Sequence, residues 1–91
     1  MDEREIRGFI NSLTEWYLPD VRKRVHLPMG AADLMGIRTI LYAGNQCMDV
    51  VMDIGDDDLA RDLLAAVKEF NRICEPWITS LRSVPPDAQI H

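Results

Sequence analysis

The clearest pattern in the chain is the helical spacing of hydrophobic positions over residues 31–54. On a helical wheel of about 100° per residue, apolar side chains of this segment fill one arc about 200° wide. Polar residues such as Asn45 and Asp49 share the opposite arc, and only Asp33 and Met35 break the division. The pattern therefore predicts one long amphipathic helix over residues 31–54.

A β-hairpin is the alternative for the same residues. Gly44 and Asn45 would form a two-residue turn between two strands within residues 37–54. However, strand alternation would put Ile40 and Val51 on the polar face, so it separates the side chains less completely than the wheel does. We expect the helix, and an α+β fold with this hairpin is the second interpretation.

A second apolar stripe runs along residues 56–83. It continues past Pro76, which falls on the polar side, so the pattern predicts one helix that this proline can kink. Residues 84–91 are predicted to be a frayed tail. Residues 1–83 are therefore expected to form a single helical domain.

The N-terminal segment carries an apolar stripe that loses its register after Pro19. Ile6 and Tyr17 mark the two ends of the regular part. The pattern predicts a helix over residues 2–17 and a short helix over residues 19–25, which Pro19 would open as a first-turn proline.

Together these segments predict an all-α fold, a small antiparallel bundle of two long helices plus an N-terminal helix broken at a proline. A length of 91 residues corresponds to one domain. The helix over 31–54 has the widest apolar arc, so it would be the central helix of a monomer or the shared seam of a homodimer. Small residues in that helix permit close approach, and we expect a homodimer. The expected seam is Gly36, Ile40, Ala43, Gly44 and Cys47.

The net charge and the charged N-terminus exclude two classes of function. A net charge of −5 and a pI near 4.8 argue against direct nucleic-acid binding, which needs a basic face. The N-terminus is charged from its second residue, and no apolar run approaches the roughly 20 residues that span a bilayer. We therefore expect no membrane association and a cytoplasmic location.

Five aspartates crowd the stretch of residues 52–64. Their spacing does not match the alternate-position ligands of a calcium loop, and we expect no metal site. We interpret the stretch as a helix start, in which Asp56 or Asp57 caps the free backbone amides and the other acids face the positive end of the helix dipole. Asp57 would pair with Arg61.

Catalytic motifs are missing from the sequence. The apolar faces of the two long helices carry no charged residue except Asp33, whereas bundle enzymes project carboxylates or histidines inward. Cys47 and Cys74 are expected to be free thiols in the core. We therefore expect no enzymatic activity, no cofactor and no metal.

One end of the predicted bundle departs from this plain pattern. In an antiparallel arrangement, four aromatic residues fall there together with charged residues and both helix-disturbing prolines. Such a combination either fills space between splayed helices or lines a pocket or partner groove. The candidate groove residues are Trp16, Tyr17, Asp20, Arg24, His26, Phe70 and Trp77.

Three functional hypotheses follow. The favoured one is a non-catalytic protein–protein interaction module, an adaptor, regulator or inhibitor that acts through helical surfaces. The second is a small-ligand-binding protein or enzyme that uses the aromatic end. The third is an acidic inhibitor that mimics nucleic acid and occupies a basic groove in another protein.

Overall fold

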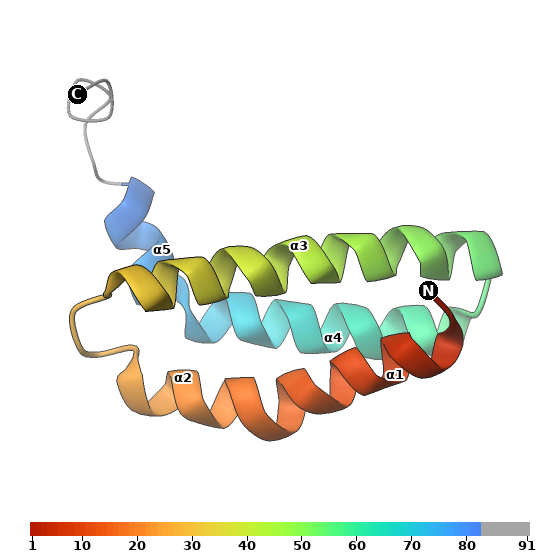
Figure 1. Cartoon of the computed structure of the whole chain (residues 1–91), viewed down its shortest axis with the longest axis horizontal. Helices are drawn as coiled ribbons and strands as arrows, with labels where there is room; N and C mark the ends of the chain where they lie inside the picture. Colours follow the sequence, from red (N-terminus) through yellow and green to blue (C-terminus); the bar gives the residue numbers. More distant parts are fainter. Residues whose placement is uncertain (83–91) are drawn as a thin grey trace.

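The computed structural model describes residues 1–82, and every regular element in that range is helical. The elements are α1 (Glu3–Ser12), a π-helical segment η1 (Leu13–Tyr17), α2 (Leu18–Arg24), α3 (Ala31–Ile54), α4 (Asp57–Ile73) and α5 (Glu75–Arg82) (Figure 1). The predicted all-α bundle is confirmed, and residues 37–54 are helix rather than hairpin. The tail predicted at 84–91 lies outside the described residues. No helix in residues 1–82 is long and apolar enough to cross a membrane.

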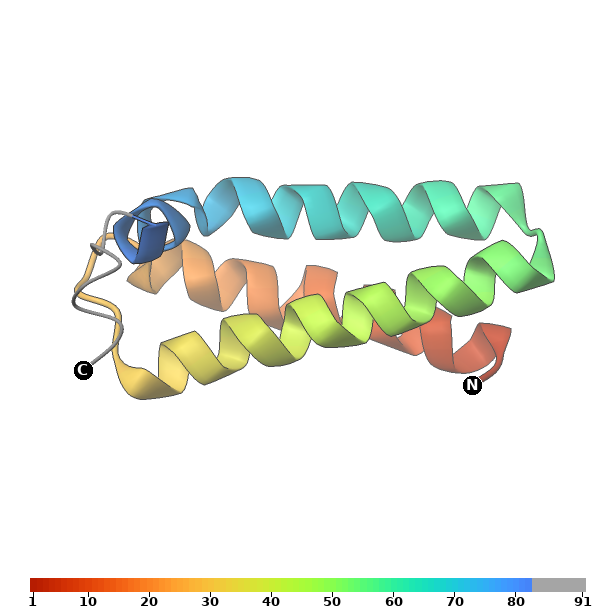
Figure 2. The same ribbon diagram turned by 90° about the horizontal axis from the view of Figure 1, so that it is seen from above.

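Three helical rods run side by side, and α4 is the central one. The continuous run α1–η1–α2 forms the first rod, α3 the second and α4 the third (Figures 1 and 2). α4 packs against the N-terminal rod, α3 and α5, whereas α3 packs mainly on α4. The prediction that residues 31–54 form the central helix of a monomer is therefore wrong. Although α3 has the widest apolar arc, α4 is the helix that packs against the most neighbouring helices.

The core between the rods is apolar. No polar or charged side chain of the described residues is buried. Fully burying one leucine or phenylalanine is worth about 1.5–3 kcal/mol, so this core supplies the main favourable contribution to folding. The largest fully buried side chains are Ile6, Leu13, Val51, Leu59, Leu63, Phe70 and Cys74.

A tight turn joins α3 to α4. Gly55 ends α3 in the left-handed region, at φ 75°, which favours glycine. Asp56 then caps α4, since its side chain accepts a hydrogen bond of 3.0 Å from the amide of Leu59. The aspartate-rich stretch is thus a helix start, as predicted. Its ion-pair partner differs from the prediction, because Arg61 pairs with Asp58 at 2.7 Å rather than with Asp57.

The separation predicted between a helix over 2–17 and a helix over 19–25 does not occur, because the N-terminal rod stays helical and holds a π-turn over Leu13–Tyr17. Regular α-helix stops at Ser12 and resumes at Leu18, and the backbone between them stays helical. The amide of Leu18 donates to the carbonyl of Leu13, five residues back. Such a turn holds one extra residue and shifts the side-chain register. The shift explains why the apolar stripe changes phase at Pro19 although the rod continues.

The single helix predicted over residues 56–83 is two helices separated at Cys74. Pro76 has no N–H to donate to the carbonyl of Arg72, as a continuous helix would require. Cys74 adopts ψ 0° and ends α4, and α5 leaves the axis of α4 (Figures 1 and 2). The proline therefore acts two residues upstream as a break, not at its own position as a kink.

Candidate partner-binding site

A cavity of about 110 Å³ lies between α2 and α3, close to the loop that joins them. Its lining includes Gly36, which is exposed, so the cavity reaches the surface. Phe70 and Trp77 are buried and close it from the α4–α5 side. We name this space the aromatic cavity. It is lined by Tyr17, Asp20, Val21, Arg24, Ala32, Asp33, Gly36, Ile37, Ile40, Phe70 and Trp77.

The aromatic cavity brings together five of the seven predicted groove residues. The other two are outside its lining. Trp16 precedes the lining residue Tyr17 but is 73% exposed, and His26 is exposed in the turn after α2. The five that converge are Tyr17, Asp20, Arg24, Phe70 and Trp77.

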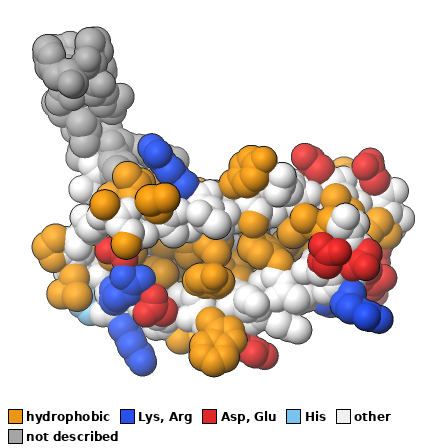
Figure 3. All heavy atoms as spheres, viewed as in Figure 1, with side chains coloured by type: hydrophobic (Ala, Val, Ile, Leu, Met, Phe, Trp, Pro, Cys, Tyr) orange, Lys and Arg blue, Asp and Glu red, His pale blue; other side chains and the backbone are white. Residues whose placement is uncertain are grey.

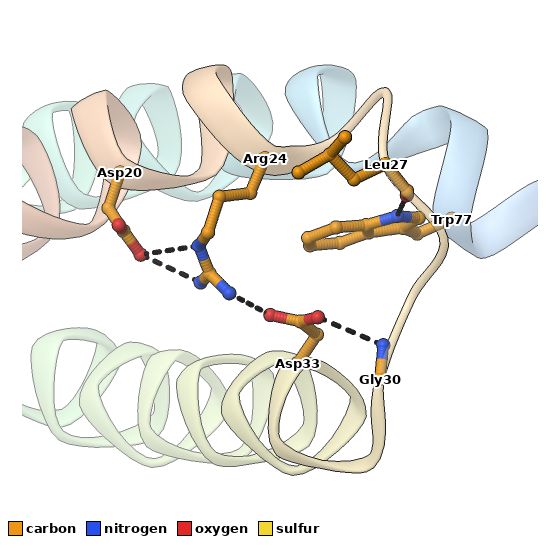
Figure 4. A network of polar contacts seen from close by, with 6 residues as sticks. All are labelled: Asp20, Arg24, Leu27, Gly30, Asp33 and Trp77. Atoms are coloured by element: carbon orange, nitrogen blue, oxygen red, sulfur yellow. Dashed lines mark hydrogen bonds and ion pairs between the residues drawn. The ribbon is translucent and has the colours of Figure 1, made fainter.

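Arg24 spans the mouth of the cavity from α2 to α3 (Figure 4). Its guanidinium donates to Asp20 at 2.7 and 3.2 Å and also forms an ion pair with Asp33. Asp33 in turn accepts a hydrogen bond of 2.9 Å from the amide of Gly30 and caps α3. One arginine and two carboxylates therefore join the two helices beside the cavity.

These contacts keep both kinds of group charged. Hydrogen bonding to Asp20, and then to Asp33, raises the pKa of Arg24. The pKa of Asp33 is lowered, first by the hydrogen bond from the Gly30 amide and then by Arg24. Arg24 and Asp33 thus stay ionised at neutral pH.

Trp77 forms the floor under this network. Its indole N–H donates to the carbonyl of Leu27 at 2.9 Å, which ties α5 to the α2–α3 loop. The guanidinium carbon of Arg24 lies 5.9 Å from the centre of its ring, within cation–π range. Because α5 turns away at Cys74, the indole reaches this loop instead of continuing along α4. The helix break that the sequence pattern concealed therefore builds the floor of the cavity.

Asp33 was missed as a site residue when the sequence was interpreted. It is one of two exceptions on the helical wheel of residues 31–54, where it falls on the apolar arc. Its side chain is only 12% exposed and meets Arg24 there. A charge on the apolar face of a helix was the available signal, and its partner on α2 explains it.

A shallow apolar channel continues from the cavity between α3 and the N-terminal rod. Figure 3 shows hydrophobic side chains along this hollow. Ala43 follows Gly36 by two helical turns and so lies on the same face of α3. Farther along, the sulfur of Cys47 lies 3.6 Å from that of Met1, so this face turns toward the start of the N-terminal rod.

The predicted dimer seam divides between the core and this channel. Ile40, Gly44 and Cys47 are buried inside the single chain, whereas Gly36 is exposed and Ala43 is half-buried. At Gly44 a Cβ would lie 3.2 Å from Val67 and 3.9 Å from Phe9. The small residue at 44 therefore serves packing within the chain. Gly36 and Ala43 are the members of the seam that a partner can reach.

Two ion pairs cross the seam between α4 and the N-terminal rod. Arg7 pairs with Asp62 at 2.7 Å, and Arg22 pairs with Glu69 at 3.1 Å. Arg72, and secondarily Arg22, lower the pKa of Glu69 to about 2. Ile10, Leu18 and Ala66 lie between these ion pairs, so this face combines charged and apolar groups.

The remaining candidate chemistry is limited. Residues 1–82 contain no group of three or more His, Cys, Asp or Glu side chains arranged to hold a metal ion. Both cysteines are free and buried. No family model, curated protein or solved structure matches the chain. The cavity and channel are therefore the basis for assigning a function.

Proposed function

We propose that this chain is a non-catalytic protein-interaction module that binds a partner over the aromatic cavity and the apolar channel. The observation that carries the proposal is a small apolar hollow with a buried aromatic floor, opening beside exposed residues of two helices. Anchor side chains at protein interfaces occupy such pockets. Homodimerisation and a cytoplasmic location stay predictions.

The size of the cavity favours a protein side chain over a small-molecule ligand. Pockets that enclose small molecules usually measure about 300–1,000 Å³. At about 110 Å³, the aromatic cavity has room for one apolar side chain instead. The rest of the binding energy would come from the surface around it.

An exposed aromatic residue at the cavity supports the same proposal. Aromatic residues and methionine are enriched where proteins meet. Tyr17 lines the cavity and is still about half exposed.

A small-ligand-binding function is the second candidate, because the aromatic cavity gathers charged and aromatic groups at one point. Mimicry of nucleic acid has less support. It needs a continuous run of unpaired acids, and five of the fifteen acids of this chain have arginine partners in residues 1–82. The paired acids are Asp20, Asp33, Asp58, Asp62 and Glu69.

Photo-crosslinking in the cells that make the protein tests the proposal. A benzoylphenylalanine at position 43, on the channel, is expected to give a discrete protein adduct. The same group at position 8, exposed on α1 with open space around it, is the matched control and should give none. Equal labelling at both positions, or a co-purifying small molecule seen by native mass spectrometry without any adduct, would contradict the interaction function.

A further inference from the structure

We propose that the partner presents an amphipathic helix with one apolar anchor side chain and a lysine or arginine one turn away. The anchor occupies the aromatic cavity, and the cation lies against Asp20. This inference rests on the interaction function proposed above and specifies the chemistry of the partner.

The cavity is prepared for an apolar anchor. Tyr17, Ile37 and Phe70 contribute apolar walls, and Trp77 is only 4% exposed. The hydrogen bond from Trp77 to Leu27 and the ion pairs of Arg24 hold these walls in place. A site that is already ordered loses little conformational freedom on binding, which favours affinity.

The shape of the channel selects a helix. The N-terminal rod and α3 border it and cross at a shallow angle (Figure 2), and a partner helix laid over them would add a fourth rod to the three of this chain. Gly36 and Ala43 have no bulky side chains, so a partner helix can approach α3 closely. The channel offers an extended peptide no strand edge to pair with, because the helices that border it use their own backbone groups internally.

Charge selects a basic residue on that helix. Asp20 and Asp33 carry two negative charges at the cavity, and Arg24 carries one positive charge, so the formal charge of the three side chains is −1. The side chain of Asp20 is 56% exposed and can accept a further donor. A cation on the partner therefore meets a net negative charge at the cavity.

A second copy of the chain is a poorer fit. Two exposed pairs one turn apart have the required chemistry, Met35 with Arg38 on α3 and Leu64 with Lys68 on α4. Met35 and Arg38 point away from the cavity, because positions one and two residues from Gly36 lie about 100° and 200° around α3. Neither Leu64 nor Lys68 lines the cavity. Docking through either pair would therefore be heterologous, and such contacts run head to tail into open-ended assemblies unless a ring closes.

Selection from a phage-displayed library of helix-forming peptides of about 18 residues provides the test. Positions for the anchor and for the residues three and four farther on are randomised. Enriched peptides are expected to carry Leu, Met or Phe at the anchor and Lys or Arg one turn later. Their affinity should fall at least tenfold on Gly36→Trp, which fills the cavity mouth, and stay unchanged on the matched surface variant Gly8→Trp.

Two more measurements sharpen the result. Asp20→Asn should weaken binding several-fold and flatten its salt dependence, because it removes the charge that faces the cation. In the wild-type protein, the Trp77 indole N–H resonance should shift when a selected peptide is added. The NMR measurement keeps the proposal testable if Gly36→Trp fails to fold.

Three outcomes overturn the inference. They are a selection without enrichment, enriched peptides without a basic residue, and peptides that bind Gly36→Trp as well as wild type. Each leaves the interaction function standing if the crosslink from position 43 persists. If the mass of the wild-type protein in solution increases with concentration, and Gly36→Trp abolishes this increase, the occupant is instead a second copy of the chain.

Discussion

At the residue scale, two glycines of α3 have opposite surroundings. A Cβ at Gly36 meets nothing within 4 Å, whereas at Gly44 it would press on Val67. Gly36→Ala should raise the free energy of unfolding by about 0.5–1 kcal/mol, because alanine is the better helix former. Gly44→Leu should lower it by about 1–3 kcal/mol through overpacking.

Urea unfolding followed by circular dichroism measures both effects. Gly8→Ala is the control for helix propensity, since Gly8 is exposed on α1 with open space around it. A neutral Gly44→Leu would show that α3 does not approach α4 as closely as the structure has it.

Glu69 predicts part of the acid sensitivity of the fold. Its pKa is lowered from 4.5 to about 2 by Arg72 and Arg22. A carboxylate with a depressed pKa in the folded state favours folding above pH 4.5, and that contribution is lost as the pH falls toward 2. Glu69→Gln should therefore melt at a lower temperature than wild type at pH 7, and the two should converge near pH 2. Thermal melts across this range, with Glu15→Gln as the exposed control, give the comparison.

At the scale of elements, η1 sets the register of α2. Deleting the exposed Thr14 removes the extra residue of the π-turn and should restore an ordinary α-helix in which Leu18 and Val21 still face the core. Deleting both Thr14 and Glu15 should instead rotate the residues beyond them by about 100° and take Leu18 and Val21 out of the core, each at a cost of about 1.5–3 kcal/mol. The single-deletion variant should melt close to wild type, whereas the double-deletion variant should keep its helical circular dichroism but melt well below both. A single deletion as destabilising as the double deletion would show that the π-turn does not hold one extra residue.

The sequence predicted some elements better than others, for physical reasons. The bounds of α3 were found because its apolar arc ends at Gly55, a residue suited to the left-handed turn. The change of phase near Pro19 was visible, but its cause was not, since a π-turn and a proline break disturb the stripe alike. The break at Cys74 was hidden because Trp77 is buried whether or not the helix continues.

The aromatic end could be located from the sequence because helical spacing places the aromatic and charged residues of separate helices at one end. The contact between Arg24 and Asp33 could not, since it depends on how α2 and α3 face each other across a loop. The openness of the channel was equally out of reach. Whether an apolar arc is covered depends on tertiary packing, and here α4 took the central position.

At the scale of the whole molecule, the labelling rate of the two cysteines measures how often the whole fold opens. Both are buried, and burial raises the pKa of Cys74 to about 11 and also raises that of Cys47. Labelling by a thiol reagent at pH 8 should therefore be slower than in the unfolded chain by about 100-fold or more. Fast labelling of the native protein would contradict the closed core.

An intramolecular disulfide is not expected. Cys47 lies eight residues before the α3–α4 turn and Cys74 nineteen after it, so their axial offset along the hairpin is about 16 Å. A bridge requires Cα atoms within about 7 Å. Mild oxidation should leave the mobility of the chain on a non-reducing gel unchanged, and a Cys47–Cys74 bridge found by peptide mapping would contradict the hairpin.

The left-handed turn at Gly55 makes the chain a candidate for domain exchange. Only Gly55 and Asp56 separate α3 from α4. If this hinge became helical, α3 and α4 would form one rod, and two chains would regain their native contacts by swapping arms. Gly55→Ala should encourage the exchange, because alanine is penalised at φ 75° by about 1 kcal/mol. Light scattering should then show slow conversion to twice 10.4 kDa, whereas Gly55→Asn, which tolerates the turn, should behave like wild type.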